Sequence, residues 1–351
     1  MKLALQIITY NSEKYLPFLF DSLRKQSFNN WQLLILDNGS HDRTIEIIQE
    51  EFKTIAQKTE LIISKENTGF AGGHNNLFKK TDSEYVVLLN PDMYLISDCL
   101  EKLVQFLETH PDTAVVSPRL MTWDFSKAAS QNIEDSFTDS IDSLGLKVYR
   151  SRRVVEWMAG KKYEEIKQNF GNSLGVEVFG VSGALPLFRR SALEAVQDDQ
   201  KNIFDPLFFM YKEDVDLAFR LREAGYKAYV KLDAVAYHDR SAAMPKKEGD
   251  RGAAINKKDQ SELIKYHSYK NHLMMLYKNE YWQNFILDFP WIFWYEFKKF
   301  MWFLLFDRKT LKGIGEIGKN QKILKSERRY IQEKIKKISW KEMRNLFAKY
   351  Y

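Results

Sequence analysis

The sequence lacks the features that mark disulfide-rich, zinc-binding and membrane-spanning proteins. Among 351 residues there is a single cysteine, Cys99, which excludes an internal disulfide framework and a cysteine-rich zinc site. No stretch reaches the roughly 18 uninterrupted apolar residues of a transmembrane helix. Met1 and Lys2 lead straight into an apolar segment with no signal-peptide cleavage site, so we expect a cytoplasmic protein.

Positive charge is also missing from most of the chain. The net charge is +6, but residues 308–351 hold fourteen lysines and arginines against four acidic residues, a local charge of +10. Residues 1–307 therefore carry −4. Because the basic character belongs to the tail alone, the composition does not indicate a nucleic-acid partner, and we expect none.

The first 120 residues alternate apolar runs with segments of helical periodicity. Strand-like runs cover residues 3–8, 31–36, 61–63 and 85–89, and apolar residues recur at helical spacing over 16–23, 45–52 and 100–107. Strands that are buried on both faces and joined by helices are typical of a parallel α/β sheet with right-handed crossovers.

Polar clusters follow four of the predicted strands, at residues 9–11, 37–40, 67–76 and 90–92. Ligands of open parallel sheets bind beyond the carboxyl ends of the strands, so four clusters in succession outline a site. Two readings stay open for the individual clusters. Asp37 is an acceptor for a base or ribose, or the start of a turn in which Ser40 or Asp42 caps a helix. Residues 67–75 form a glycine-rich loop that approaches a ligand closely, or an ordinary irregular loop.

Neither of the common phosphate-binding signatures is present in that glycine-rich segment. It is not a G-x-G-x-x-G fingerprint, and it lacks the Lys-Ser/Thr ending of a P-loop. Dinucleotide-binding and P-loop proteins are therefore disfavoured.

Asp92 lies at the end of the very apolar run 86–89, where a carboxylate is costly unless a cation meets it. Oxygen ligands suit Mg²⁺ or Mn²⁺. The alternative is a turn, since Asn90, Pro91 and Asp92 are good turn formers. His238 follows another apolar stretch; such a histidine is usually structural, but it also fits a metal site together with Asp92.

Three acids, Glu213, Asp214 and Asp216, follow the aromatic segment 204–211. In a helix that begins near Glu213, Asp216 and Arg220 are spaced for an ion pair. Glu213 and Asp214 would then be first-turn acids that favour the helix dipole, or Asp214 would be a general base at the mouth of an aromatic pocket.

In order along the chain, these segments resemble family 2 glycosyltransferases, and more narrowly the bacterial rhamnosyltransferase-like and galactofuranosyltransferase-like members. The resemblance covers about residues 3–241 and includes Ser182, Gly183 and Ala184 as well as the clusters above. It implies a GT-A fold, an α/β architecture with a mostly parallel central sheet flanked by helices. It also implies a nucleotide-diphospho-sugar donor, a divalent metal and inversion at the anomeric carbon.

The resemblance assigns roles to individual residues. Asp214 would be the catalytic base, with Glu213 beside it shaping the acceptor site, and Asp92 and His238 would bind Mg²⁺ or Mn²⁺. Asn90 replaces the first acid of the family's DxD motif, so metal binding rests on fewer charges. The residues implied in nucleotide-sugar binding are Thr9, Tyr10, Asn11, Asp37, Asn67, Gly69, Phe70, Gly72, Gly73, Asn75, Asn90 and Gly183.

The implied reaction moves a sugar from dTDP-rhamnose or a UDP-sugar to a hydroxyl of a glycan or lipid-linked glycan, in surface polysaccharide synthesis of the bacterial cell envelope. Two other functions stay open. A non-catalytic nucleotide-sugar-binding module would share the N-terminal motifs but need not keep both Asp214 and His238. A metal-dependent nucleotidyltransferase would carry a basic phosphate-binding motif near its start, which is not found.

We expect a catalytic domain at 1–245, with a nucleotide-sugar-binding half at 1–120 and an acceptor and catalytic half at 121–245, followed by a helical, aromatic-rich and basic region at 255–351. Residues 281–306 contain four tryptophans directly before the +10 tail. This composition indicates a helix at a membrane surface, so we expect a peripheral protein of the cytoplasmic face of the inner membrane. A helical hairpin packed on the catalytic domain, or on a second copy in a homo-oligomer, is the alternative.

Overall fold

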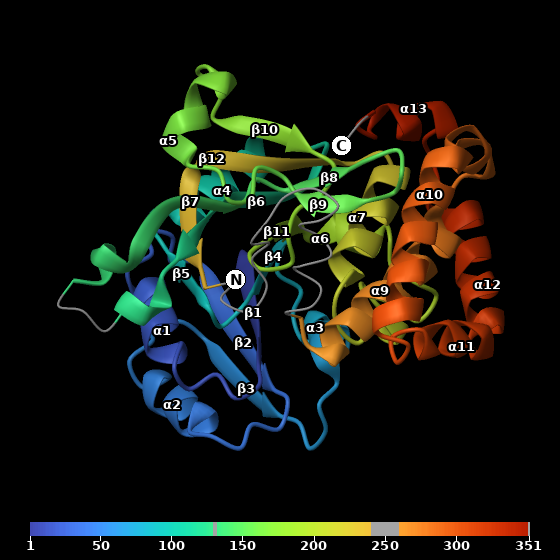
Figure 1. The fold of residues 1–351 in the computed structure, drawn as a ribbon. Helices are drawn as coiled ribbons and strands as arrows, with labels where there is room; N and C mark the ends of the chain where they lie inside the picture. Colours follow the sequence, from blue (N-terminus) through green and yellow to red (C-terminus); the bar gives the residue numbers. More distant parts are fainter. Residues whose placement is uncertain (129–131, 240–259, 350–351) are drawn as a thin grey trace.

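The computed structural model describes residues 1–128, 132–239 and 260–349 (Figure 1). The predicted boundaries at residues 245 and 255 lie outside the described residues. The strands are β1 Leu3–Thr9, β2 Trp31–Asp37, β3 Thr59–Ile63, β4 Tyr85–Leu89, β5 Met93–Leu95, β6 Thr113–Trp123, β7 Phe137–Ser143, β8 Leu146–Val148, β9 Val154–Glu156, β10 Gly175–Val178, β11 Leu187–Arg189 and β12 Lys227–His238.

The helices include each of those predicted from periodicity in the first 120 residues. They are α1 Leu16–Arg24, α2 Thr44–Glu51, α3 Gly69–Phe78, α4 Cys99–Thr109, α5 Tyr163–Ile166, α6 Arg190–Glu194, α7 Glu213–Glu223, α9 Glu262–Asn279, α10 Trp282–Phe306, α11 Lys312–Lys319, α12 Gln321–Tyr330 and α13 Trp340–Asn345.

The central sheet has ten strands, with the order β10-β12-β6-β11-β4-β1-β2-β3 and with β5 and β7 paired to β12 and β6. Strands β3, β2, β1, β4, β6 and β12 point the same way, because β11 runs antiparallel to both of its neighbours β4 and β6. Every residue of β2 and β4 is buried, as expected for strands covered on both faces. The carboxyl ends of the parallel strands therefore meet at one edge of the sheet.

Helices cover both faces of this sheet. Apolar residues of α1, α2 and α4 pack in one core cluster with Leu3, Leu5 and Ile7 of β1. On the other face, α3, α6 and α7 supply side chains that pack against Val86 and Leu88 of β4. This three-layer α/β arrangement is the predicted fold class.

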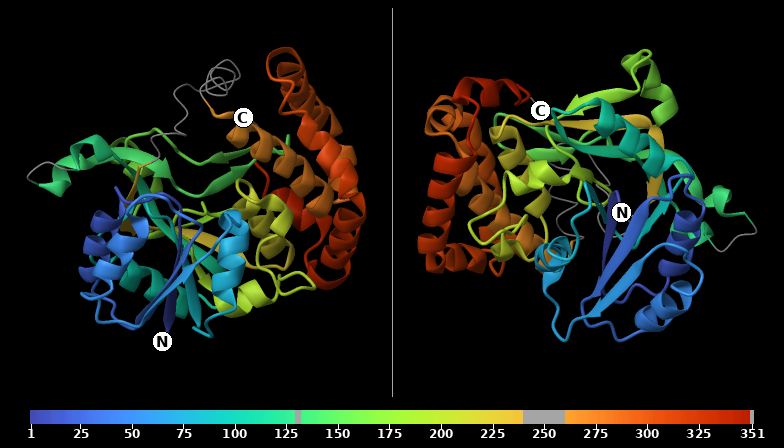
Figure 2. Two further views of the ribbon diagram at one scale, coloured as in Figure 1. Left: turned by 90° about the horizontal axis from the view of Figure 1, so that it is seen from below. Right: turned by 180° about the vertical axis from the view of Figure 1, so that it is seen from behind.

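The C-terminal helices form a separate layer on one side of the sheet domain (Figure 2). Helix α9 begins after its N-cap Ser261, and its Met274 and Met275 pack with Val215 and Phe219 of α7. Leu324 of α12 and Met343 of α13 complete this cluster. Among the described residues, no helix combines the length and hydropathy needed to cross a bilayer.

Candidate active site

The first part of the site lies where β1 and β2 end. Asp37 is fully buried there, and both of its carboxylate oxygens are occupied. Oδ1 accepts hydrogen bonds from the hydroxyls of Thr9 (2.9 Å) and Ser40 (2.5 Å), and Oδ2 accepts from the amides of Gly39 (3.0 Å) and Ser40 (2.8 Å). Asp37 thus orders the strand ends.

Tyr10 and Asn11 are the predicted donor-site residues that this arrangement leaves at the surface. Tyr10 is half exposed, and Asn11 has a left-handed backbone, with φ at 50°. The Asn11 side chain accepts a hydrogen bond from the amide of His41 at 2.9 Å. An aromatic ring and turn amides at the end of β1 are chemically suited to a nucleobase and its ribose.

The glycine motif forms a helix rather than the predicted loop. Residues from Gly69 onward make up α3, and Asn67 caps its start by accepting a hydrogen bond from the Gly69 amide at 2.9 Å. The Asn38 side chain donates to the Gly69 carbonyl at 3.2 Å and so ties the end of β2 to this helix. The expectation of a loop was wrong, because the glycines serve here to let helix α3 approach its neighbours closely.

Two glycines of α3 show this packing directly. A Cβ on Gly69, where φ is +71°, would lie 2.2 Å from the Phe209 carbonyl oxygen, and a Cβ on Gly73 would lie 2.7 Å from Cδ1 of Ile8. Any other residue would push α3 away from β1 and from the segment that leads into α7. Gly72 has more room, with Thr68 as its nearest neighbour.

Asn75 joins the two halves of the sheet domain. Its Oδ1 accepts hydrogen bonds from the amides of Ile203 and Phe204, both at 3.0 Å, and its amide group donates to the Phe204 carbonyl at 2.8 Å. The side chain is buried and holds the start of the aromatic segment 204–211. The structure thus places Asn75 beneath the predicted donor site.

Asp214 lies in the first turn of α7, and α7 begins at Glu213 as predicted. Its Oδ2 accepts a hydrogen bond from the Gly183 amide at 3.2 Å, and its Oδ1 accepts from the Val215 amide at 2.8 Å. A Cβ on Gly183 would be 3.5 Å from both the Asp214 Cβ and the Phe70 ring. Phe70, Gly183 and Asp214 are therefore adjacent, although they come from distant parts of the sequence.

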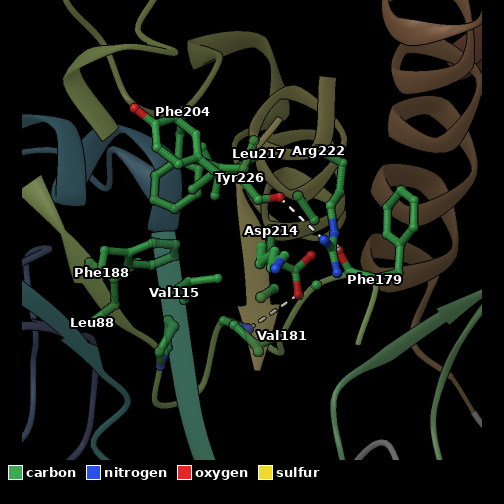
Figure 3. A pocket seen from close by; sticks show the side chains of 17 residues that line it. Leu88, Val115, Phe179, Val181, Phe188, Phe204, Asp214, Leu217, Arg222 and Tyr226 are labelled. Carbon is green, nitrogen blue, oxygen red and sulfur yellow. Dashed lines mark hydrogen bonds between the residues drawn. The ribbon is translucent and has the colours of Figure 1, made fainter. Parts of the chain in front are cut away.

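Asp214 is half-buried, and Figure 3 shows it among the side chains that line a pocket with Leu217 and Val181. Asn90, at the end of β4, reaches the same region, because its backbone N–H donates to the Ala184 carbonyl at 3.0 Å. The acid at the start of α7 and the end of β4 thus meet at residues 183 and 184.

Glu213 and Lys212 give Asp214 an unusual electrostatic setting. Burial, with Asp214 next to it, raises the pKa of Glu213 well above its usual value. Burial also lowers the pKa of Lys212, which precedes the helix with a left-handed φ of 71°. In both neighbours of Asp214, burial thus favours the uncharged form.

The predicted ion pair inside α7 is confirmed. The guanidinium Nε of Arg220 is 3.0 Å from Oδ2 of Asp216, and both side chains are buried. Asp216 also accepts a hydrogen bond from Asn279 at 2.9 Å and lies 3.4 Å from Nζ of Lys278. Asp216 therefore secures α7 against α9, while Asp214 remains at the pocket.

Asp92 and His238 come together because β5, which follows Asp92, pairs with the end of β12. Met93 is the direct partner of His238 in this antiparallel pair. His238 Nε2 lies 3.4 Å from Oδ1 of Asp92, and Nδ1 lies 2.9 Å from Oδ2 of the buried Asp142. Burial opposes the charged form, but the two carboxylates raise the pKa of His238 to about 10.

These residues suit a divalent metal in their chemistry. With Nδ1 hydrogen-bonded to Asp142, the Nε2 atom is left facing the Asp92 carboxylate, which is the orientation of a histidine ligand supported by a second carboxylate. Within the described ranges no cluster of three or more His, Cys, Asp or Glu residues forms a cation site. Two protein ligands fit an ion that completes its coordination with the phosphate oxygens of a bound substrate.

Sequence reasoning missed Asp142 and Lys212. Asp142 is in β7, within a segment where the sequence carries no recognisable motif, and only the pairing of β6 with β7 brings it to His238. Lys212 stands directly before the three acids, and nothing in the sequence singles it out. Neither residue had a signal in the sequence alone.

Comparison with known proteins identifies the family to which this chain is similar. The model of the family described as "Glycosyl transferase family 2" matches residues 5–197, more than half of the chain. The chain is 30% identical over 115 residues to the putative glycosyltransferase EpsE of Bacillus subtilis, which is 33% of this chain and 41% of EpsE. It is 25% identical over 257 residues to the O-antigen chain rhamnosyltransferase RfbN of Salmonella typhimurium, 72% of this chain and 70% of RfbN.

Among solved structures, the chain resembles the mannosyltransferase PcManGT from Pyrobaculum calidifontis in complex with GDP-Man and Mn²⁺. The TM-score is 0.52 at 16% identity, over 90% of this chain and 75% of the other. This similarity confirms the predicted GT-A fold. The match spans less than half of EpsE, whereas the family model covers both the sheet edge and the residues around Gly183. The chain belongs to glycosyl transferase family 2.

Proposed function

We propose that this glycosyltransferase moves a hexose from a nucleotide-diphospho-sugar to a hydroxyl of a glycan or lipid-linked glycan, with inversion at the anomeric carbon. The observation that carries the proposal is the placement of Asp214. A half-buried carboxylate, fixed by the Gly183 amide, lies beside Phe70 of the glycine-rich helix α3 and near the end of β4. An acid held at the meeting point of donor-side and acceptor-side elements is suited to general-base catalysis.

In this mechanism Asp214 accepts the proton of the acceptor hydroxyl. The oxygen attacks the anomeric carbon from the face opposite the diphosphate, a new glycosidic bond forms, and the nucleoside diphosphate leaves with the bonding electron pair. The raised pKa of Glu213 disfavours a second negative charge beside the base.

Asp92 and His238 would hold a divalent metal ion, Mg²⁺ or Mn²⁺. When bound, the ion neutralises charge on the departing diphosphate. Asp142 keeps the Nδ1 proton of His238 in place, so that Nε2 is presented toward Asp92. The presence of Mn²⁺ in the PcManGT complex supports this part of the proposal.

On the donor side, we propose that the Tyr10 ring contacts the nucleobase and that turn residues at the end of β1 contact the ribose. The Thr9–Asp37–Ser40 hydrogen bonds hold these elements in place, with Asn67, Gly69, Gly72, Gly73 and Asn75 supporting α3 behind them. The similarity to RfbN supports dTDP-rhamnose, with a UDP-sugar as the other donor, and an acceptor in surface polysaccharide synthesis.

We further propose that the reaction takes place at the cytoplasmic face of a membrane, to which the C-terminal region attaches the enzyme. The lone buried cysteine suits a reducing compartment, and residues 281–306 precede a strongly basic tail. A homo-oligomer is the other use of the same region.

A donor panel tests the proposed function. Purified protein is incubated with UDP- and dTDP-sugars, with Mn²⁺ or with EDTA, and release of nucleoside diphosphate is followed together with transfer to lipid extracts and oligosaccharides. We expect one donor to be turned over, faster with Mn²⁺, and the Asp92→Ala variant to lose the response to Mn²⁺.

Binding of a nucleotide-sugar without turnover of any donor in the panel would identify a binding module instead. Release of inorganic diphosphate from a nucleoside triphosphate and a sugar phosphate would identify a nucleotidyltransferase. Either outcome would overturn the proposed transfer reaction.

A further inference from the structure

Helix α10 is packed in the opposite sense to an ordinary surface helix. Its buried residues are the polar Asn284 and Asp288 and the apolar Ile292 and Phe303, and Glu296 and Lys299 are largely buried. All of its exposed side chains in the described structure are apolar. These are Trp282, Phe285, Ile286, Leu287, Phe289, Pro290, Trp291, Phe293, Trp294, Phe297, Phe300, Leu305 and Phe306.

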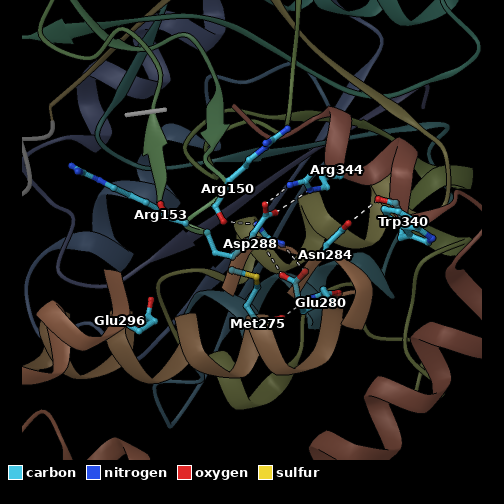
Figure 4. A network of polar contacts seen from close by, with 12 residues as sticks. Arg150, Arg153, Met275, Glu280, Asn284, Asp288, Glu296, Trp340 and Arg344 are labelled. Atoms are coloured by element: carbon cyan, nitrogen blue, oxygen red, sulfur yellow. Dashed lines mark hydrogen bonds and ion pairs between the residues drawn. The ribbon is translucent and has the colours of Figure 1, made fainter. Parts of the chain in front are cut away.

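The polar side of α10 is firmly bonded to the rest of the protein. Asp288 lies 3.1 Å from Nη1 of the fully buried Arg152 and 2.7 Å from Nη2 of Arg344. Asn284 donates to the Trp340 carbonyl at 2.9 Å, and Figure 4 shows both side chains directed to these partners. The helix cannot turn its aromatic side inward without leaving these buried charges unpaired.

The outward side is continuous along the helix. Phe285, Phe289, Phe293 and Phe297 form a ladder in which successive ring centroids are 5.7 Å apart. Exposed apolar patches of this extent on a protein surface mark contact with another apolar phase. The tryptophans on the same side, Trp282, Trp291 and Trp294, are the residue type enriched where protein meets the lipid headgroup region.

The charges that follow α10 indicate which apolar phase this is. On α11 and α12 the exposed charged side chains are Lys312, Lys319, Lys322, Lys325 and Arg329. The acids of this region are paired: Asp307 with Lys265 at 2.8 Å and Glu316 with Lys270 at 2.8 Å. Arg329 is paired with Glu333 at 2.7 Å, so the excess of positive charge rests on the lysines. Aromatic side chains followed by this excess of exposed cations are complementary to an anionic lipid surface, whereas a second copy of the chain would bring its own cations into the contact.

The inner side of α10 lies close to the proposed catalytic base. His272 of α9 bonds Glu296 of α10 at 2.8 Å through its Nε2. One residue earlier on α9, the Asn271 side chain donates to the carbonyls of Met210 (2.9 Å) and Tyr211 (2.7 Å), directly before Lys212. The positive charge of Lys299 lowers the pKa of Lys212 further, beyond the effect of burial. Within the described residues, α9 lies between α10 and the segment that carries Asp214 and is bonded to both.

We propose that α10 lies in the plane of an anionic lipid surface, with its aromatic side in the headgroup region, and thereby fixes the active site at a short height above the membrane. Packed helices are about 8–10 Å apart, so two such steps, α10 to α9 and α9 to α7, give about 20 Å. The acceptor class that this height fits is a short lipid-linked saccharide, whose reacting hydroxyl is within a few sugar units of the lipid. This substrate class rests on the proposed transferase function, whereas the docking itself does not.

Docking is tested by flotation of the full chain with vesicles of phosphatidylglycerol and phosphatidylethanolamine, with no donor or acceptor present. We expect the wild type to float. The double variant Phe289→Glu, Phe293→Glu should bind at least roughly tenfold more weakly, since each substitution replaces an aromatic ring that would lie in the lipid headgroup region by a charge. Leu174→Glu is the matched control: Leu174 is exposed to a similar extent but lies beside β10. It should float like the wild type.

The height is tested by energy transfer to headgroup-labelled lipid from a dye on an engineered cysteine. Cys99 is fully buried, so only the new thiol reacts. We expect strong transfer from Tyr211→Cys, beside the site, and weak transfer from Lys53→Cys, beyond α2 on the far side of the sheet domain (Figures 1 and 2).

Equal flotation of wild type and the double phenylalanine variant would overturn the docking surface. The docking surface would also be overturned if the wild type did not float and light scattering showed a dimeric wild type but a monomeric double variant. In that case α10 would face a second copy of the chain. Equal energy transfer from the two labels would overturn the height. A chain that docks as expected but turns over no donor would overturn the proposed transferase and leave the docking intact.

Discussion

The sheet domain and helix α10 of the C-terminal helical layer place their polar and apolar residues differently. In the sheet domain, apolar residues such as Leu33 and Val87 fill the centre, and polar groups collect at the carboxyl ends of the strands. On α10, the buried Asp288 is held by Arg152 of the segment between β8 and β9, and the aromatic residues face out. The residue distribution of the sheet domain suits a surface in contact with water, whereas the outer face of α10 suits contact with lipid.

Buried ion pairs connect the sheet domain to the helical layer. Lys278 of α9 lies 2.6 Å from Asp205 and 3.4 Å from Asp216, next to the start of α7. Burial works against the charge on this lysine, but the surrounding carboxylates raise its pKa. The chemistry of the sheet edge is therefore positioned by polar contacts from the helical layer.

The largest effect is expected where the two regions meet, at the proposed base. Asp214→Asn should lower kcat roughly 10²–10⁴-fold, because the amide cannot accept the proton of the acceptor hydroxyl. The measurement is transfer with the donor identified by the panel, alongside circular dichroism to show an intact fold. Glu213→Gln is the control for the neighbouring carboxyl, and its loss should be far smaller because Glu213 takes no part in the proton transfer and its raised pKa favours the neutral form that glutamine mimics. Equal losses in both variants would show that Asp214 is not the base.

The next effect tests whether buried charge stabilises the helical layer. Arg152→Ala should cost about 3–5 kcal/mol of unfolding free energy, since it leaves Glu280 and Asp288 buried without their shared partner. Urea denaturation followed by tryptophan fluorescence measures it. Arg329→Ala removes the exposed pair with Glu333 and should give no measurable change. If both variants unfold at the same urea concentration, the polar interior of this layer is not what holds it.

A smaller, pH-dependent effect is expected from Glu223, which is fully buried at the end of α7 and lies 3.1 Å from Lys336. Burial outweighs this pair and raises the pKa of Glu223 to about 8. In the unfolded chain the pKa is about 4.3. Between these values the folded state binds the extra proton, so stability falls as pH rises from about 4.3 through 8.

Glu223→Gln should remove this dependence. The gain in unfolding free energy over wild type should be near zero at about pH 4, on the order of 2 kcal/mol at about pH 6, and larger still toward about pH 8. Thermal unfolding across the pH range measures it. A variant that is less stable than wild type at high pH would show that the ion pair with Lys336 dominates.

The smallest effect is expected on the outer face of α10. Phe293 is 53% exposed, so Phe293→Ser should change the unfolding free energy by no more than about 0.5 kcal/mol in lipid-free buffer. Phe208→Ala, at a fully buried ring in the core cluster between the sheet domain and the helical layer, should cost about 3–5 kcal/mol. Strong destabilisation by Phe293→Ser would mean that this face is covered within the protein, and would remove the contrast between the two regions.

Most of the secondary structure of the sheet domain could be predicted from the sequence, because the alternation of buried strands and amphipathic helices leaves a strong periodic signal. β1, β2, β4, α1, α4 and α7 all lie where periodicity predicts them. The sequence was insufficient for the glycine motif. Three glycines within residues 69–73 favour a loop by local preference, but contact with Ile8 and Phe209 makes them a helix. Contacts between distant segments decide such a case, and they leave no local trace.

The candidate site was predicted only where its residues follow strands. Strand ends identified Asp37, Asp92 and His238, whereas Asp142 depends on β7 pairing in a segment without a pattern. The aromatic composition of α10 indicated a surface helix, but its inverted packing depends on Arg152 and Arg344, which lie 136 and 56 residues from Asp288. Hydrogen bonds of such separation cannot be deduced from composition.

The short bridge between Tyr149 and Ala348 bears on how the protein is produced in the laboratory. The Ala348 amide donates to the Val148 carbonyl at 2.8 Å, and the Arg150 amide donates to the Ala348 carbonyl at 3.0 Å, so the chain returns to the sheet domain two residues from buried Arg152. A fragment cut after Asn279 would keep Lys278 and Arg152 while discarding Glu327, Asp288 and Glu280. An affinity tag is therefore better placed at the amino terminus, and the catalytic part is better handled as the whole chain in detergent than as a trimmed fragment.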